Sequence, residues 1–269
     1  GGTAGLKAIT VGSATEGGHA LFTSANAVAA ATISVLGGDN GAEDSVAEFQ
    51  DAVTATAVIL NDATGESTIE INATNGAQTI AGTFNAASGG EGTLLITDDD
   101  VDAAPDLLTF SGRFGQTGGI GDVKIGSSTE GGNALFTDAN AFVATNITLE
   151  GGNNSNEDAF AEFQDAVTAT AIVLNDAGGG GVTSVEFNAT NGAQAIAGTI
   201  NAGSAGEGTI LVTDDDANEA AQALTFSSII GGTAGVGALT VGSATEAGHA
   251  VFTSANPVVV AAVSVLGGD

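Results

Sequence analysis

The chain has 269 residues, a formal net charge of −29 and only three basic residues, Lys7, Arg113 and Lys124. Binding to nucleic acid or to an anionic membrane requires Lys and Arg, so the composition argues against both partners. The absence of Cys excludes disulfides and thiolate chemistry, and a hydrophobic content of 43% is too high for a disordered acidic chain.

Short runs rich in Val, Ile, Thr and Phe, separated by Gly, Asn and Asp, predict β-strands from the start of the chain. No apolar run approaches the ~18–20 residues that span a bilayer, so we expect no membrane insertion. In the first 114 residues the predicted strands are 7–11, 20–23, 31–36, 55–60, 68–71, 79–84, 93–97 and 107–110.

The segment after residue 39 has two interpretations. Asn40 with Glu43 resembles a helix capping box, and Val46, Phe49 and Val53 have nearly helical spacing. One prediction is therefore a helix of one or two turns. The alternative is a loop after which Phe49 begins the next strand.

The chain repeats itself along its whole length. Residues 72–100 return at 188–216 with 23 of 29 positions identical, and residues 1–39 return at 231–269 with 29 of 39 identical. We therefore divide the chain into repeat unit 1 (1–114), repeat unit 2 (115–230) and a partial repeat unit 3 (231–269). Because the third unit is incomplete, we expect the chain to be a segment of a longer array.

Near-identical units should fold alike. We expect equivalent positions of units 1 and 2 to lie on the same face, with their difference confined to the turn at Gly178–Gly181, which adds two residues. If a unit of 114 residues holds five coils, each coil has about 23 residues, near the usual solenoid length.

The predicted fold is all-β, a right-handed parallel β-solenoid (β-helix) of tandem units of about 114 residues. The alternative is a series of tandem Ig-like β-sandwiches, which have a similar length and strand number. Small aliphatic side chains and 42 Gly, without Trp or Tyr, favour the narrow interior of a solenoid. The expected interior is Val11, Leu21, Phe22, Ile33, Val35, Phe49, Val58, Leu60, Ile69, Ile71, Ile80, Leu95, Leu108 and Phe110.

Six segments of the repeat carry a resemblance to a known family: 49–56, 60–62, 78–86 (QTIAGTFNA), 92–94, 108–112 and 119–126. They resemble the passenger region of alphaproteobacterial autotransporters, in particular the rickettsial outer-membrane surface antigens that coat the cell. The resemblance implies a β-helical passenger exposed at the cell surface, or a surface layer.

Two runs of aspartate are the densest groups of oxygen ligands. Calcium binds six to eight oxygens from carboxylates and carbonyls, which a turn between strands can supply. The alternative is a solvated turn without an ion. Calcium is thus the one cofactor that the sequence suggests, and its candidate ligands are Asp98, Asp99, Asp100, Asp214, Asp215 and Asp216.

No constellation of residues indicates an enzyme. His19 and His249 occupy one repeat position, and Asn133 occupies it in unit 2. The chain has no other His and no Cys, so the sequence offers no nucleophile–base pair and no zinc set. We therefore expect no catalytic residues.

The predicted function is structural, in an extracellular filament or a cell-surface layer. Alternatives are an adhesin or autotransporter passenger that binds a surface or host partner, and a calcium-dependent matrix protein. The expected partner is the chain itself, associating head-to-tail or laterally. Because the net charge opposes lateral contact, we expect divalent cations or high ionic strength to strengthen it.

Overall fold

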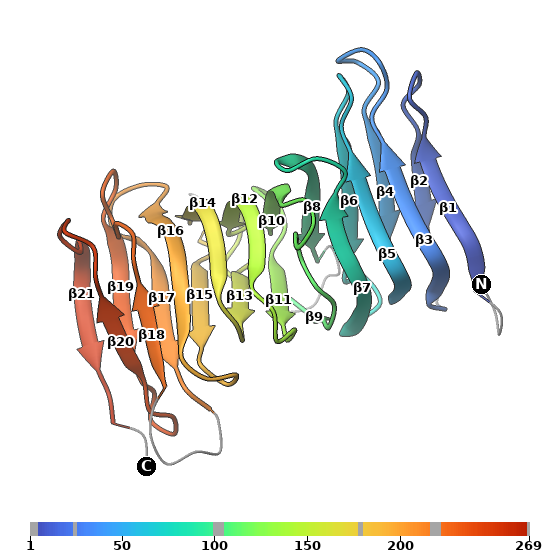
Figure 1. The fold of residues 1–269 in the computed structure, drawn as a ribbon. Coiled ribbons are helices and arrows are strands. Elements are labelled where there is room, and N and C mark those ends of the chain that lie inside the picture. Colours follow the sequence, from blue (N-terminus) through green and yellow to red (C-terminus); the bar gives the residue numbers. More distant parts are fainter. Residues whose placement is uncertain (1–4, 24–25, 99–104, 177–179, 216–221, 268–269) are drawn as a thin grey trace.

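The computed structural model describes residues 5–23, 26–98, 105–176, 180–215 and 222–267. Within these ranges the chain forms 21 strands and no helix (Figure 1). Odd-numbered strands form an 11-stranded sheet, here called sheet A, and even-numbered strands form a 10-stranded sheet B.

Sheet A consists of β1 (Leu6–Gly12), β3 (Val28–Leu36), β5 (Val53–Asn61), β7 (Gln78–Ala86), β9 (Leu107–Phe110), β11 (Gly132–Phe136), β13 (Ala159–Phe163), β15 (Thr183–Asn188), β17 (Glu207–Thr213), β19 (Val236–Val241) and β21 (Val260–Val265). Sheet B consists of β2 (His19–Phe22), β4 (Ser45–Phe49), β6 (Ser67–Asn72), β8 (Glu91–Thr97), β10 (Ile120–Ile125), β12 (Phe142–Glu150), β14 (Val167–Asn175), β16 (Gln194–Ala202), β18 (Ala223–Phe226) and β20 (His249–Phe252).

Consecutive strands alternate between the two sheets. All pairing between named strands is parallel. Two strands and two turns therefore make one coil, and about ten coils stack along one axis. The right-handed parallel β-solenoid predicted from the sequence is confirmed. Tandem Ig-like sandwiches are excluded for this chain, because their sheets are antiparallel.

The core lies between the two sheets and is filled by alternate residues of each strand. Most predicted interior positions are buried, and Phe22 packs against them although it is not fully covered. Two predictions were wrong. Leu21 is 53% exposed, because it precedes the inward Phe22 and successive strand residues face opposite sides. For the same reason Leu95 faces outward, between the buried Leu94 and Ile96.

The segment after residue 39 is a turn followed by a strand, so the helix prediction was wrong. Asn40 closes the turn by accepting a hydrogen bond from the backbone N–H of Ala42 through its Oδ1 at 3.0 Å. Residues Ser45–Phe49 then form β4, which pairs with β2 on one side and β6 on the other. Parallel pairing on both edges outweighs the weak helical spacing of the apolar residues.

Because of β4, one repeat unit contains nine strands, β1 to β9, and β10 begins the second unit. A unit is therefore four and a half coils, which corrects the five coils suggested by its length. An odd number of strands moves each equivalent strand to the other sheet. Thus β4 lies in sheet B, whereas its counterpart β13 lies in sheet A.

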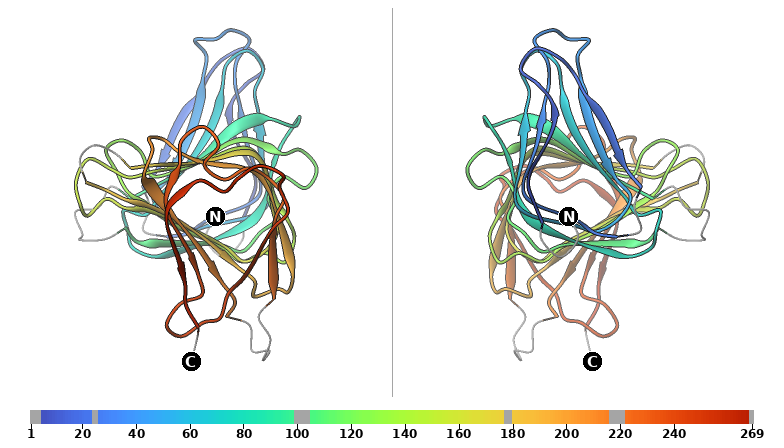
Figure 2. Two further views of the ribbon diagram at one scale, coloured as in Figure 1. Left: turned by 90° about the vertical axis from the view of Figure 1, so that its left-hand side faces the viewer. Right: turned by 90° about the vertical axis from the view of Figure 1, so that its right-hand side faces the viewer.

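The expectation that equivalent positions share a face was therefore wrong, because equivalent strands of units 1 and 2 lie in opposite sheets. Residues that point into the core in unit 1 nevertheless have counterparts that point into the core in unit 2. The strand and burial patterns of β7 and β8 are the same as those of β16 and β17. Viewed along the axis, the N-terminal turns project upward and the C-terminal turns downward (Figure 2). Consecutive units thus present the same turns in different directions.

Turns are fixed by a carboxylate at the end of β5 and at the end of its counterpart β14. The Oδ1 of Asp62 accepts hydrogen bonds from Ser67 N at 2.7 Å and Ser67 Oγ at 2.6 Å, and its Oδ2 accepts one from Gly92 N at 2.7 Å. Gly92 has φ +74°, and a Cβ there would lie 2.3 Å from the Cβ of Leu60. Asp176 makes the same bonds in unit 2, to Thr183 and Gly208.

Phenylalanine rings stack through the middle of the core. Phe136 lies 5.1 Å from Phe110 and 4.9 Å from Phe163, measured between ring centroids, and both pairs are stacked. Phe114 and Phe142 join the same cluster at 4.9 Å. The cluster connects successive coils and bridges the end of unit 1 to the start of unit 2.

Candidate functional site

The aspartate runs lie after β8 and its counterpart β17. Asp98 and Asp214 are buried, at 6% and 7% exposure. The Oδ2 of Asp98 accepts a hydrogen bond from the backbone N–H of Asp106, and Asp214 accepts one from Gln222 in the same way. Each carboxylate thereby links the end of one strand to the residue just before the next strand.

Of the other predicted calcium ligands, only Asp215 lies within the described residues, and its carboxylate accepts a hydrogen bond from Thr190 Oγ1. Asp99, Asp100 and Asp216 lie outside the described residues. In the part of the chain that the structure describes, no group of three or more His, Asp or Glu could hold a metal ion. A calcium site at these runs therefore stays a prediction.

Outward glutamates form a second acidic feature, which sequence analysis missed. Glu48 of β4 stands in register beside Glu70 of β6, and Glu162 of β13 stands beside Glu186 of β15. The Oε1 of Glu162 accepts hydrogen bonds from Gln164 Nε2 at 2.8 Å and Asn188 Nδ2 at 3.0 Å. Amide donors thus partly offset the repulsion between like charges on neighbouring strands.

The environment of Glu186 disfavours the charged form of its carboxyl. The pKa of Glu186 is raised to about 6, chiefly by burial and also by the nearby carboxylates of Glu162, Glu246 and Asp215, against the lowering effect of a hydrogen bond from Thr213. Its charged form is therefore less stable than that of an ordinary glutamate.

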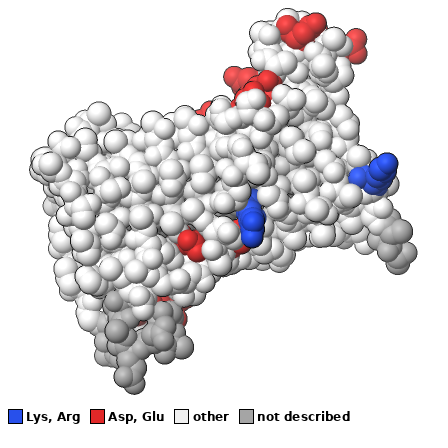
Figure 3. Space-filling view, in the orientation of Figure 1, with Lys and Arg blue, Asp and Glu red and all other residues white. Residues whose placement is uncertain are grey.

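The acidic residues are distributed unevenly between turns and sheets. Of the 32 Asp and Glu residues, eight lie within the strands that the structure describes: Glu48, Glu70, Glu91, Asp122, Glu150, Glu162, Glu186 and Glu207. On the face seen in Figure 3, red side chains gather over the turns that join β3 to β4 and β5 to β6, while most of the sheet surface is uncharged. The few blue side chains are widely separated.

The strands of each unit form two kinds of surface. The low-charge band of unit 1 consists of β1, β3, β5, β7 and β9, which contain no Asp or Glu and only one charged residue, Lys7. The low-charge band of unit 2 consists of β10, β12, β14, β16 and β18, which contain Asp122, Lys124 and Glu150. Of the remaining strands of units 1 and 2, those that contain glutamate form the glutamate bands: β4, β6 and β8 in unit 1, and β13, β15 and β17 in unit 2.

These bands alternate along each sheet. Sheet A begins with the low-charge band of unit 1 and continues with the glutamate band of unit 2. Sheet B begins with the glutamate band of unit 1 and continues with the low-charge band of unit 2. Each face of the solenoid therefore carries the low-charge band of one full unit, and the two bands are offset by one unit. Strands β19 and β21 of the partial unit 3, which also lie in sheet A, contain no charged residue.

The histidine position lies at the beginning of a strand. His19 and His249 are exposed and begin β2 and β20. Asn133 lies at the corresponding place in β11, where its Nδ2 donates a hydrogen bond to Pro105 O at 3.2 Å. The position is thus used in unit 2 to fasten a turn.

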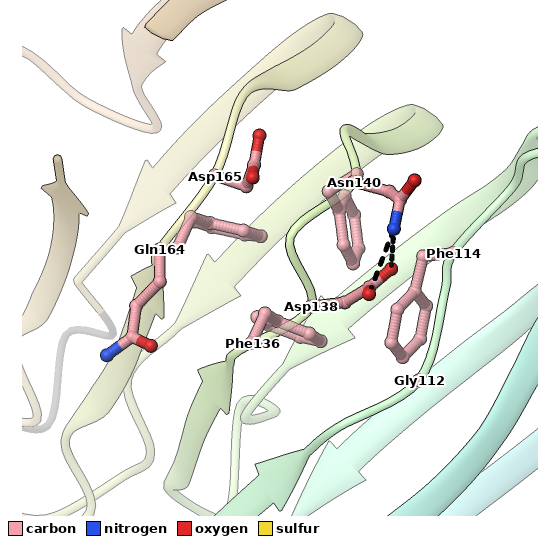
Figure 4. Close-up of a pocket in the computed structure, with 9 residues that line it drawn as sticks. Gly112, Phe114, Phe136, Asp138, Asn140, Gln164 and Asp165 are labelled. Atoms are coloured by element: carbon pink, nitrogen blue, oxygen red, sulfur yellow. Dashed lines mark hydrogen bonds between the residues drawn. The ribbon is translucent and has the colours of Figure 1, made fainter. Parts of the chain in front are cut away.

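A small cavity lies at the phenylalanine cluster (Figure 4), with a volume of about 10 Å³. Phe114, Phe136 and Phe163 line it, and at its mouth Asn140 Nδ2 donates to the carboxylate of Asp138 at 3.1 Å. A cavity of this size accommodates about one water molecule, so it is too small for an organic substrate.

Comparisons with known proteins identify no relative of the chain. No protein family, no curated protein and no solved structure matches the chain. Among the described residues, the structure has no helix long and apolar enough to cross a membrane. The functional argument therefore depends on the fold and on the distribution of its side chains.

Sequence analysis missed the bands because it counted eight strands in unit 1 instead of nine. The signal was present in Glu48 and Glu70, each of which lies between two inward apolar residues in a pattern of period two. Their neighbourhood, however, depends on parallel pairing between coils, which alternation along one strand does not specify.

Proposed function

We propose that this chain is a structural segment of an extracellular filament or a cell-surface layer. The observation that carries the proposal is the return of the same nine-strand unit in one continuous solenoid. Each coil contacts only its neighbours, so identical units add length without requiring a new core. Such a molecule is suited to spanning distance and to presenting the same surface repeatedly.

The composition of the surface supports the same role. Acidic turns give a highly charged, soluble exterior, and the chain contains no Cys, Met, Trp or Tyr, the side chains most easily oxidised. The partner in this proposal is the chain itself. Divalent cations or high ionic strength are expected to favour lateral association by neutralising or screening Asp and Glu.

Immunogold electron microscopy tests the proposal directly. Antibodies raised against the chain should label filaments or a continuous layer outside the cells that produce it. The control is the same antibody after adsorption with purified chain. Label confined to the cell interior would contradict the proposal, whatever the purified chain does in solution.

A further inference from the structure

We infer that the low-charge band is the surface through which two copies of this chain pack side by side, low-charge band against low-charge band. The inference rests on the proposed structural function and specifies which surface assembles. The occupant is a second copy, because equivalent strands of the two repeat units form a low-charge band on each face of the same chain.

Charge selects this surface over the others. Turns and glutamate bands of two copies repel each other, and burying their carboxylates would require partners that a chain with three basic residues lacks. The middle strand of the low-charge band of unit 1 presents the exposed Thr54 and the half-buried Ala57 and Ile59, whose burial costs far less than the burial of a carboxylate. Interface cores are generally depleted of charge in the same way.

The low-charge band is large enough to form an interface between two copies. Five strands spaced ~4.8 Å apart are roughly 24 Å wide, and strands of four to nine residues are on average about 25 Å long. This gives roughly 600 Å² per band, not far below the ~800 Å² that each partner contributes to a standard interface. A longer array would add one such contact per unit.

The offset between the two faces predicts how the assembly grows. One molecule has a low-charge band on each face, so it can bind one neighbour through sheet A and another through sheet B. The contact therefore continues from copy to copy and forms a layer instead of stopping at a dimer. Glutamate bands face each other beside every contact, so screening by salt should promote growth.

Substitution of equivalent threonines tests the inference. Thr54 of β5 and Thr168 of β14 are exposed, hold equivalent positions and lie in the low-charge bands of sheets A and B. The matched control changes Thr93 of β8 and Thr209 of β17, which are equivalent positions in the glutamate bands. Both double variants, T54E/T168E and T93E/T209E, add the same charge through the same chemical change.

Sedimentation velocity and negative-stain imaging of the full chain, at about 0.15 M and 1 M NaCl, give the readout. In 1 M NaCl we expect the wild type and T93E/T209E to form assemblies several molecules wide. T54E/T168E should lose at least tenfold in lateral association, and each single variant, T54E or T168E, should stop at dimers. Width is the quantity scored, because end-to-end contacts lengthen an assembly without widening it. Circular dichroism verifies that each variant is folded.

Three results would overturn the inference. The wild type could stay one molecule wide in 1 M NaCl, T54E/T168E could widen as the wild type does, or T93E/T209E could lose as much association as T54E/T168E. In the second and third cases lateral assembly itself persists in the wild type, so the choice of surface fails while the proposed structural function stands. The proposed function fails separately, through the localisation of the native protein.

Discussion

Individual carboxylates determine the path of the chain at the turns. The carboxylate of Asp62 accepts three hydrogen bonds, two from Ser67 in its own turn and one from Gly92 in the next coil. Asp176 repeats this arrangement in unit 2. Aspartates in this solenoid therefore serve structure at some positions and give the surface its charge at others.

Replacing Asp62 by alanine should destabilise the chain by about 3 kcal/mol, because three donors lose their acceptor and Ser67 is fully buried. The control is D39A, which removes the same charge from an exposed turn and should change stability by less than about 0.5 kcal/mol. Urea unfolding followed by circular dichroism measures both. Equal midpoints for D62A and D39A would contradict this account of the turn.

The raised pKa of Glu186 should make the free energy of unfolding depend on pH. Its pKa is raised to about 6 in the folded chain, chiefly by burial, above the ordinary value of 4.5. The folded state therefore binds the proton more tightly than the unfolded state does. The favourable contribution is fully present below about pH 4.5 and is lost as the pH rises through about 6.

The size of this contribution is about 1 kcal/mol, after allowance for solvent screening of a partly exposed group. The neutral variant E186Q should thus be more stable than the wild type at pH 7, and the difference should vanish near pH 4.5. E16Q removes a charge from an exposed turn and serves as the control. The same stability difference between E186Q and wild type at both pH values would refute the role given to Glu186.

At the scale of elements, pairing decides what local sequence leaves open. Residues 46–53 have apolar spacing compatible with a helix, yet β4 is a strand because β2 and β6 bond to both of its edges. The same pairing places Phe49 in the core, stacked on Phe22 with 4.6 Å between ring centroids. Each strand is stabilised mainly by the coils on either side.

Strand β13 offers a matched comparison between its two faces. Phe163 is buried, at 1% exposure, and stacks on Phe136, whereas Phe160 faces outward on the same strand. F163A should cost about 3–5 kcal/mol through lost burial and the resulting cavity, and F160A less than about 1 kcal/mol. Thermal and urea unfolding of the two variants provide the measurement, and similar losses at both positions would contradict the assigned faces.

For the whole molecule, the number of strands per unit is the decisive quantity. Nine strands make four and a half coils, so one unit should add about 22 Å of length at ~4.8 Å per coil. The odd number also exchanges the two faces at every unit. The alternation of low-charge and glutamate bands follows from this parity.

Deleting residues 115–230 tests whether one nine-strand unit can be removed without disrupting the rest of the solenoid. The deletion joins β9 to β19, which is equivalent to β10, so the chain should fold with β19 in place of β10. X-ray scattering should show a molecule shorter by about 22 Å, with a single cooperative unfolding transition. The control deletion, 115–202, removes fewer residues but joins β9 to β17 out of phase. Greater stability of the control than of the in-phase deletion would contradict a nine-strand unit.

The sequence by itself determined the repeat, the all-β class and most of the interior. These features are local, since period-two alternation assigns Ile69 and Ile71 to one side of a strand, and repetition transfers each assignment to the next unit. The assignment failed at Leu21 and Leu95, where two apolar residues are adjacent and alternation alone does not select the inward one.

Only the tertiary structure decided the number of strands, the exchange of faces and the neighbours of each outward side chain. Glu162 and Glu186 are 24 residues apart in the chain and become neighbours because β13 and β15 pair in parallel. Such contacts depend on the length of every turn and on whether β4 pairs with its neighbours. Counting one strand fewer assigns each later strand to the wrong sheet. The neighbours of the outward side chains therefore depend on all the preceding strands and turns, whereas the inward side chains are determined by alternation within each strand.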